Sequence, residues 1–442
     1  MRKDMTDLPY PYREAVPLYF YPFLSPLTCQ ADAAMVHNFH SSLQERKAPD
    51  LDRLIYIHIP FCKDICFFCG FYRDAIGHGN QEVLRAYVES LKAEIKAYSE
   101  TEYLRKCKIS AVYFGGGTPT ILGHDLMDSL LRTIHDSFAV EPGTELSYEG
   151  EVRTLKDKDK LKVLKALGCT RVSFGVQTFN ERARRLSGLK PTMADIRECI
   201  DNINEYGFDP NLDLMYGLPG QTESVWESDL KKAIELRAAN IDIYDTVLYP
   251  HTILFRQRHK LKNELPTLSQ RLTMMEMGMR LLVDAGYTQE TIEDFHLPSK
   301  GYKMKRLVYG GGDGRSEILA CGAAAVGVLN GYSYRNLTPQ KYLNWWENRK
   351  LPPELMYRMT DEDFRKRALV FFPKVLELKK ECLPFGWLEQ YRPIIDGMKD
   401  RQLIEETSTS LMPTEKGMLW ADNMAMEFLE TREQRKIWKI GH

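Results

Sequence analysis

Short apolar runs alternate with longer amphipathic stretches through the middle of the chain, and this alternation restricts the fold more than any other feature. The runs expected to be strands cover 54–59, 109–114, 145–150, 171–176, 211–215 and 241–248. Between them, apolar residues recur every three or four positions, as on one face of a helix. This repeat favours a parallel sheet with right-handed crossovers. Its six units predict an α/β fold with a partial or complete parallel (β/α) barrel.

Two flanking regions lack this repeat. Residues 1–50 carry prolines at positions 9, 11, 17, 22 and 26, which predicts an extended N-terminal arm around the barrel. We expect the barrel over 51–300 and a barrel-closing strand and linker over 301–350. A small helical, winged-helix-like C-terminal domain is expected over 351–442, with a helix starting near 360–363. The basic runs 303–306 and 432–436 are interpreted as solvated faces.

Composition excludes several classes of protein. The 60 basic and 61 acidic side chains give a net charge of −1, whereas a general nucleic-acid binder needs a basic surplus. No apolar run is long enough to span a membrane, and the N-terminus lacks the apolar core of a signal peptide. The number of cysteines is nine, which is odd and does not suit a disulfide framework, so we expect a reduced, cytoplasmic protein.

Three of the nine cysteines form the most specific motif in the chain. Cys62, Cys66 and Cys69 fall within eight residues as C-x3-C-x2-C. Three thiolates can hold three irons of a [4Fe–4S] cluster and leave the fourth iron open. A zinc site, which would need a fourth ligand such as His58, and a redox or disulfide role are the alternatives. The other six are interpreted as small buried hydrophobes: Cys29, Cys107, Cys169, Cys199, Cys321 and Cys382.

The segment around these cysteines resembles a known family. Tyr56-Ile-His-Ile-Pro-Phe-Cys62, then Cys66 and Phe68-Cys69-Gly70-Phe71, is similar to the radical S-adenosylmethionine (SAM) superfamily. More narrowly, it resembles the oxygen-independent coproporphyrinogen III dehydrogenase (HemN-like) family, from about residue 50 to the C-terminus. The resemblance implies that Cys62, Cys66 and Cys69 are the catalytic ligands of a [4Fe–4S] cluster. It also implies that SAM chelates the open iron and is reductively cleaved to methionine and a 5′-deoxyadenosyl radical.

A glycine run, Gly115-Gly116-Gly117-Thr118-Pro119-Thr120, follows the second expected strand and matches a SAM-binding loop of the family. Glycines at a strand end let the backbone approach a ligand closely. Asp213 is costly to bury inside an apolar strand without a partner, so a ribose hydroxyl or an ammonium is a natural ligand. The resemblance implies that Tyr56, Gly116, Glu149 and Val326 contact the cluster-bound SAM. Where members hold a second SAM, it lies against the residues that match Phe68, Gly117, Thr118, Gln177, Asp213 and Val247.

The chain departs from the family at two places. The family arginine that holds a methionine carboxylate is replaced by Leu189, so we hypothesise that Lys190 binds the carboxylate of the second SAM, with Arg184 and Arg185 one turn earlier as alternatives. The Asn-x-x-Tyr-Trp element of the haem-chaperone branch is absent near residue 310, which argues against that branch. Glu149-Gly150 looks closer to branches that methylate rings.

The leading hypothesis is therefore a class C-type radical methyltransferase. It would use a [4Fe–4S] cluster and two SAM molecules to methylate an sp2 carbon of a planar conjugated substrate, a tetrapyrrole such as haem or a menaquinone. An electron donor such as flavodoxin or ferredoxin is expected as a partner. The alternatives are decarboxylation of coproporphyrinogen III, a haem-binding, chaperone-like protein with a vestigial cluster, and other radical chemistry such as cyclopropanation.

Overall fold

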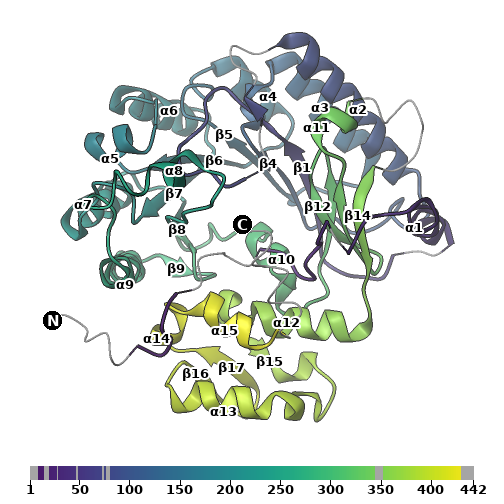
Figure 1. Cartoon of the computed structure of the whole chain (residues 1–442). Coiled ribbons are helices and arrows are strands. Elements are labelled where there is room, and N and C mark those ends of the chain that lie inside the picture. The colour runs from purple at the N-terminus through teal and green to yellow at the C-terminus, as the bar shows by residue number, and fades with distance from the viewer. Residues whose placement is uncertain are drawn as a thin grey trace.

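The computed structural model describes residues 8–13, 19–26, 28–45, 48–71, 74–75, 80–343 and 352–429. Within these residues the chain forms a twelve-stranded sheet in the order β14-β13-β12-β11-β1-β4-β5-β6-β7-β8-β10-β9 (Figure 1). The strands are β1 (Arg53–Ile59), β4 (Ala111–Gly116), β5 (Glu145–Gly150), β6 (Arg171–Gln177), β7 (Asp209–Tyr216), β8 (Asn240–Asp245), β9 (Thr288–Gln289), β10 (Asp294–His296), β11 (Glu317–Cys321), β12 (Val326–Leu329), β13 (Tyr332–Asn336) and β14 (Pro353–Arg358).

Strand–helix units build the central part of this sheet. Seven of its strands, β11, β1 and β4–β8, run parallel. The connections that follow β1 and β4–β8 contain these helices: α2 (Gln81–Ser99), α3 (His124–Ser137), α4 (Lys158–Ala166), α5 (Glu181–Leu186), α6 (Met193–Glu205), α7 (Glu223–Glu235), α8 (Ile253–Gln257) and α9 (Leu268–Asp284). The edge strands β9 and β14 do not pair with each other in the described residues. The predicted α/β fold with a mostly parallel sheet is confirmed, and the described residues show no closed barrel. The predicted domain boundaries stay a prediction.

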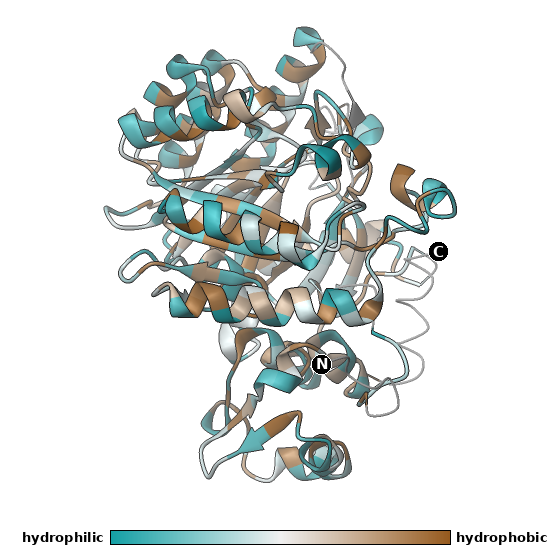
Figure 2. Ribbon diagram, turned by 90° about the vertical axis from the view of Figure 1, so that its left-hand side faces the viewer, coloured by the Kyte–Doolittle hydropathy of each residue, from teal (hydrophilic) through white to brown (hydrophobic). Residues whose placement is uncertain are grey.

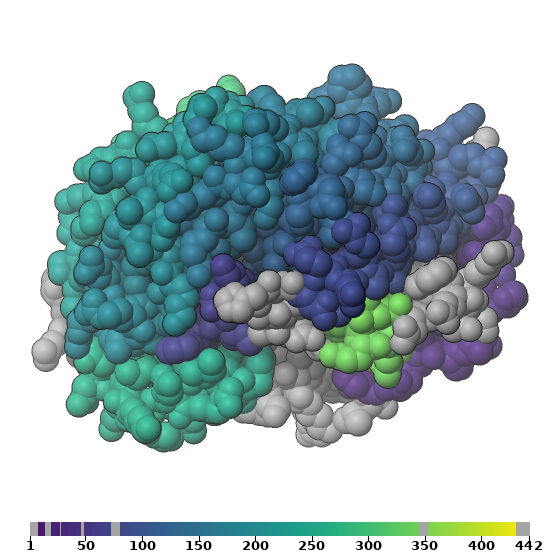
Figure 3. All heavy atoms as spheres, turned by 90° about the horizontal axis from the view of Figure 1, so that it is seen from above, coloured from purple at the N-terminus to yellow at the C-terminus, as the bar shows by residue number. Residues whose placement is uncertain are grey.

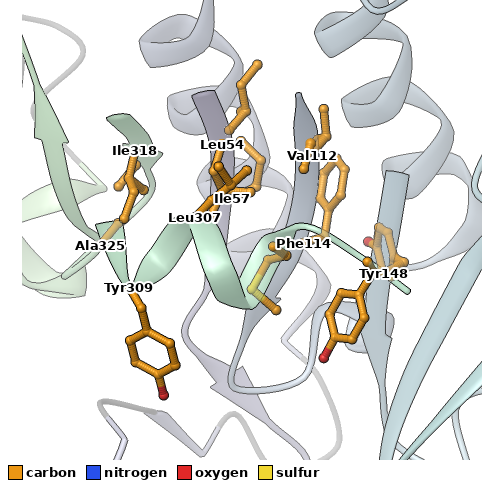
Figure 4. Close-up of a cluster of buried hydrophobic side chains, with 14 of the residues drawn as sticks. Leu54, Ile57, Val112, Phe114, Tyr148, Leu307, Tyr309, Ile318 and Ala325 are labelled. Carbon is orange, nitrogen blue, oxygen red and sulfur yellow. The ribbon is translucent and has the colours of Figure 1, made fainter. Parts of the chain in front are cut away.

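The two faces of the parallel sheet differ in polarity, because successive side chains of a strand point to opposite faces. On the convex face, Val112, Phe114 and Tyr148 are fully buried, and the rings of Phe114 and Tyr148 stack with centroids 4.8 Å apart (Figure 4). The crossover helices turn their apolar sides toward this face and their hydrophilic sides outward (Figure 2). On the concave face, the alternate positions are largely polar, for example Tyr56 on β1 and Asp213 on β7.

Helix α10 (Met304–Val308) closes one end of the concave face. It crosses in front of β1 and β4, and its Leu307 belongs to the same buried hydrophobic cluster as Leu54 (Figure 4). Just before the helix, the Lys303 amide donates to the Glu145 carboxylate (2.5 Å), and Glu145 is the first residue of β5. The closed end is therefore the amino-terminal end of the strands, and the carboxyl-terminal end is left for a site.

The prediction that the run 303–306 is a solvated face is wrong for Lys305. Its ammonium lies 3.2 Å from the Asp294 carboxylate and 3.8 Å from that of Asp242, and the side chain is only 14% exposed. The reason is electrostatic: Asp242 and Asp294 face each other on β8 and β10, so a buried cation is needed between them. The run 432–436 lies outside the described residues.

The N-terminal arm is only partly extended, because it contains the helix α1 (Ala33–Glu45). Phe39 and Leu43 lie one turn apart on α1 and are fully buried, and the Phe39 ring packs 5.1 Å from that of Tyr332 on β13. Seen from above, the purple N-terminal residues run along the edge of the molecule (Figure 3). Nearer the N-terminus, Arg13 forms an ion pair with Asp245 at the end of β8 (2.7 Å).

The C-terminal domain lies below the large sheet in Figure 1. It contains α12 (Asp361–Val375), α13 (Arg392–Asp400), α14 (Glu415–Met418), α15 (Ala421–Glu427) and a sheet of β15 (Leu378–Lys379), β17 (Ser410–Pro413) and β16 (Ile404–Glu406). Thr360 caps α12 reciprocally with Asp363, as the predicted helix start requires. Arg367 of α12 donates to the carbonyls of Gly314 (3.0 Å) and Ser316 (2.8 Å), so the glycine-rich segment before β11 docks this domain.

No helix in the described ranges combines the length and apolar character needed to cross a membrane. The predicted cytoplasmic location stays a prediction.

We predict that Gly314→Ala weakens the docking of the C-terminal domain. Gly314 has a φ of +81°, and a Cβ there would lie 2.2 Å from the Phe364 carbonyl oxygen. Gly331, in the turn between β12 and β13, has a φ of +79° with nothing within 4 Å of an added Cβ, so Gly331→Ala is a matched control. In denaturant unfolding, we expect about 1–2 kcal/mol of lost stability for the control and about 2–5 kcal/mol for Gly314→Ala. Equal losses would contradict the steric argument.

Candidate active site

The cysteine loop, residues 60–71, follows β1 at the open end of the sheet and carries all three clustered cysteines. Its position is held by backbone hydrogen bonds: the Phe67 amide donates to the Ser187 carbonyl (3.1 Å), and the Leu254 amide donates to the Phe67 carbonyl (2.8 Å). Ser187 follows α5 and Leu254 lies on α8, so both partners come after the carboxyl ends of strands. The thiols of Cys62, Cys66 and Cys69 therefore lie where catalytic groups of parallel barrels gather.

Three thiols on one loop suit the three protein ligands of a [4Fe–4S] cluster. Among the residues that the structure describes, no three Cys, His, Asp or Glu side chains converge to hold one metal ion. In a [4Fe–4S] cluster each thiolate binds its own iron, so convergence on one point is not required. His58 does not act as a fourth zinc ligand through Nδ1, because that atom is hydrogen-bonded to the Tyr56 hydroxyl (2.8 Å).

The glycine loop, residues 115–118, packs directly on the cysteine loop. A Cβ on Gly117 would lie 2.7 Å from the Phe61 carbonyl oxygen and 3.0 Å from the Cys62 sulfur. Gly116 has a φ of +119°, and a Cβ there would lie 2.7 Å from the His58 ring. Glycine is therefore required at both positions for this close approach.

Two of the predicted SAM contacts meet beside this loop. The Gly116 amide donates to the Glu149 carboxylate (3.1 Å). Burial, and secondly the charge of Asp213, raise the pKa of Glu149 to about 8, while burial raises the pKa of Asp213 to about 6. The Tyr56 ring stacks on that of Tyr113, with the ring centroids 6.2 Å apart. Burial, and secondly the charge of Glu149, raise the pKa of Tyr56. A bound cation would restore the ionised form of both carboxyls, and SAM carries a sulfonium charge.

Gln177 lies at an irregularity in the pairing of β6 with β7 and has a φ of +66°. Its buried Oε1 accepts no hydrogen bond from any residue that the structure describes. The remaining predicted contacts lie at the same end of the sheet: Phe68 on the cysteine loop, Thr118 after β4, Val247 after β8 and Val326 at the start of β12. Thr118 is buried, and the other three are partly exposed.

The three cations proposed for the second carboxylate differ in their availability. The Arg184 guanidinium is buried and donates to the carbonyls of Val176, Thr178 and Pro191, so it braces the backbone. Arg185 is exposed and pairs with Glu181 at 3.9 Å. Lys190 is exposed and lies two residues after Gly188. A Cβ on Gly188 would lie 2.5 Å from the Phe67 ring, so the segment before Lys190 packs on the cysteine loop.

Sequence reasoning missed a buried polar cluster on the floor of the concave face. The Tyr302 hydroxyl donates to Asp242 (3.0 Å) and Asp294 (3.2 Å), and Lys305 contacts the Tyr244 hydroxyl. Burial raises the pKa of Asp242 well above its usual value. The signal that could have found the cluster is the period of two in β8, where polar or tyrosine positions alternate with two isoleucines.

A second missed feature is a cluster of four aromatic side chains beside the cysteine loop, called the aromatic mouth below: Tyr19, Phe71, Tyr249 and Tyr309. The Tyr19 ring stacks on Tyr309 (6.4 Å between centroids) and lies 6.5 Å from Phe71. Tyr249 packs so closely on Gly70 that an added Cβ would lie 2.3 Å from its ring. Lys374 of α12 is fully buried, and its ammonium lies 5.3 Å from the ring centres of both Tyr19 and Tyr309. The same ammonium pairs with the carboxylates of Asp422 (3.0 Å) and Glu293 (3.9 Å).

Comparison with known proteins agrees with this geometry. A family model described as the radical SAM superfamily matches residues 56–233. The chain is 30% identical to the haem chaperone HemW of Lactococcus lactis subsp. lactis over 384 residues, which cover 85% of this chain and 96% of that protein. It is 26% identical to the anaerobilin synthase of Escherichia coli O157:H7 over 432 residues, or 95% of this chain and 90% of that protein. The solved structure of coproporphyrinogen III oxidase (HemN) from Escherichia coli has a similar fold, with a TM-score of 0.76 at 23% identity over 92% of this chain and 96% of that one.

These relatives correct part of the functional expectation. The two sequence relatives are named as a haem chaperone and an anaerobilin synthase, and neither name supports a methyltransferase. The names of the relatives fit a protein that binds haem or oxidises a tetrapyrrole as well as they fit a methyltransferase, or better. The missing Asn-x-x-Tyr-Trp element therefore counts less against the haem-chaperone branch. The expected cofactors are those of the superfamily, a [4Fe–4S] cluster and SAM. With a relative 30% identical along 96% of its length and a superfamily match that spans the cysteine and glycine loops, the chain belongs to the HemN-like family of the radical SAM superfamily.

Proposed function

We propose that this chain is a radical SAM enzyme that modifies a tetrapyrrole ring, with an activity of the anaerobilin synthase kind. The observation that carries the proposal is the aromatic mouth beside the cysteine loop, with the buried ammonium of Lys374 against two of its rings. A tetrapyrrole is a large planar ring with carboxylate side chains. Aromatic faces would recognise the ring. The Lys374 ammonium already pairs with Asp422 (3.0 Å), so its role is to hold the rings of Tyr19 and Tyr309 in place.

The extent of the sequence match favours ring modification over haem carriage alone. The match to the anaerobilin synthase covers 95% of this chain, so it takes in more than half of the 50-residue arm and most of the C-terminal domain. The arm carries Tyr19 of the aromatic mouth, and the C-terminal domain carries Lys374, whose ammonium lies beside that ring. A bilin is an opened tetrapyrrole, so the proposed substrate is haem or a closely related macrocycle.

Each part of the site has a role in this proposal. Cys62, Cys66 and Cys69 would hold the cluster, which would supply one-electron reducing chemistry to a bound SAM. Gly116 and Glu149 hold the SAM through the glycine loop and a buried carboxylate. The aromatic mouth covers the reactants and excludes water. An electron donor such as flavodoxin or ferredoxin would deliver the electron at the cysteine loop.

Transfer of a methyl group from a second SAM is the second candidate function. It is favoured by Gln177, whose buried Oε1 accepts no hydrogen bond within the described part of the chain, and by Asp213, which faces the same interior. A buried amide oxygen and a buried carboxylate suit the hydroxyl and ammonium groups of a second SAM molecule. In this proposal Lys190 binds its methionine carboxylate.

The proposed function predicts that anaerobically reconstituted protein consumes haem and SAM together. We expect 5′-deoxyadenosine to form, and the Soret absorbance of haem to fall as an opened product appears by mass spectrometry. Cys66→Ala should lose cluster and activity to background. Cys382→Ala, at a partly exposed cysteine of the C-terminal domain, is the matched control and should keep both. Tight haem binding without SAM cleavage would contradict the proposal in favour of a chaperone, and release of carbon dioxide from coproporphyrinogen III would favour the decarboxylase.

The second candidate predicts two bound SAM molecules and formation of S-adenosylhomocysteine. Lys190→Ala should weaken the second site about 10- to 100-fold, since a hydrogen bond to a charged group contributes about 1.5–3 kcal/mol. Equilibrium dialysis with labelled SAM measures both sites, and Arg185→Ala tests the other exposed cation that could bind this carboxylate. An unchanged stoichiometry and unchanged methyl transfer in Lys190→Ala would remove Lys190 from this role.

A further inference from the structure

We propose that Thr118 tunes the iron–sulfur cluster: its hydroxyl donates a hydrogen bond to the Cys62 thiolate and raises the reduction potential of the bound cluster. The inference rests on the proposed role of Cys62 as an iron ligand. It gives Thr118 a different role from the contact with a second SAM that the family resemblance implies.

The geometry places the hydroxyl on the sulfur. Thr118 Oγ1 lies 3.5 Å from Cys62 Sγ, within the range of a hydrogen bond to sulfur, and Thr118 is the donor. Both residues are 8% exposed, so water competes little for either atom. In a dry surrounding, a hydrogen bond to a charged acceptor is stronger than in water.

The Thr118 hydroxyl does not cap the short helix that follows it. Thr118 precedes the short 3₁₀ helix Pro119–Ile121, where a threonine commonly accepts a hydrogen bond from a backbone amide of the first turn. Here the side chain makes no such capping bond, and Pro119 removes one of the amides. The side chain turns toward the cysteine loop instead.

The backbone fixes this orientation. The Gly117 amide donates to the Ile59 carbonyl (2.8 Å), which ties the glycine loop to the end of β1. Because Gly117 carries no Cβ, the loop approaches the Cys62 sulfur closely enough for the neighbouring hydroxyl to reach it. Thr118 therefore donates to one particular sulfur, that of Cys62.

A hydrogen bond at this sulfur affects the two redox states unequally. Reduction adds one electron, and the added negative charge spreads onto the sulfur ligands. A donor stabilises the more negative, reduced cluster more than the oxidised one, so the potential rises. Electron transfer from the donor that initiates SAM cleavage becomes easier in consequence.

The test measures the midpoint potential of the reconstituted [4Fe–4S] cluster by anaerobic redox titration followed with EPR. Thr118→Val removes the hydroxyl and keeps the shape, and we expect a more negative potential. The equilibrium constant for reduction should fall about fivefold, as a differential of about 1 kcal/mol requires. Thr118→Ser restores the hydroxyl and should restore the potential. Thr120→Val is the control, because Thr120 belongs to the same segment but bonds to Thr154.

The outcomes separate this inference from the proposed function. If the cluster of Thr118→Val has an unchanged midpoint potential, the inference is overturned. If that variant also binds one SAM fewer, Thr118 instead contacts the second SAM. If Thr118→Val holds no cluster, a Thr118→Ser protein with a normal cluster and potential supports the inference, whereas failure of both variants overturns it in favour of a steric role. Failure of the wild-type protein to assemble a cluster would refute the ligand assignment itself.

Discussion

The buried ion pair between Arg53 and Glu317 fixes the strand register on which the candidate site depends. The two side chains are 1% and 5% exposed and lie 2.6 Å apart, on residues that face each other across β1 and β11. Glu317 also accepts hydrogen bonds from the Tyr103 hydroxyl (2.7 Å) and the Asn330 amide (2.8 Å). A slip of one residue would turn Tyr56 to the convex face and move the cysteine loop. Because burying such a pair costs desolvation energy, we interpret it as a determinant of register more than of stability.

With this register, the concave face acquires a chemistry unlike that of an ordinary barrel core. Such cores are packed with branched apolar side chains. Here Glu149, Asp213, Asp242 and Asp294 line the interior, and Lys305 from the closing helix neutralises part of their charge. Burial favours the protonated form of Glu149 and Asp213. This interior suits a positively charged cofactor such as SAM, whose binding would draw the neighbouring carboxyls toward their ionised form.

Features formed by a few neighbouring residues of the sequence could be predicted. Features formed by residues far apart in the sequence could not. The strand–helix repeat, the cysteine loop, the glycine loop and the cap at Thr360 each occupy a few consecutive residues with a definite physical requirement. Lys305 was misjudged because its partners lie on β8 and β10, and only the folded sheet brings them together. The aromatic mouth draws on residues 19, 71, 249 and 309, which no periodicity connects. We propose that such distributed residues recognise the substrate. The methyltransferase branch is inferred from short motifs alone, and the names of the relatives do not support it.

The central claim is that three thiols on one loop hold a [4Fe–4S] cluster whose open iron binds SAM at the carboxyl end of the sheet. EPR spectroscopy of the anaerobically reduced protein, recorded before and after addition of SAM, tests it most directly. We expect the signal of a reduced [4Fe–4S] cluster, with g-values that change when SAM chelates the open iron. A cluster signal that SAM leaves unchanged, or a protein that takes up zinc in place of iron and sulfide, would contradict it.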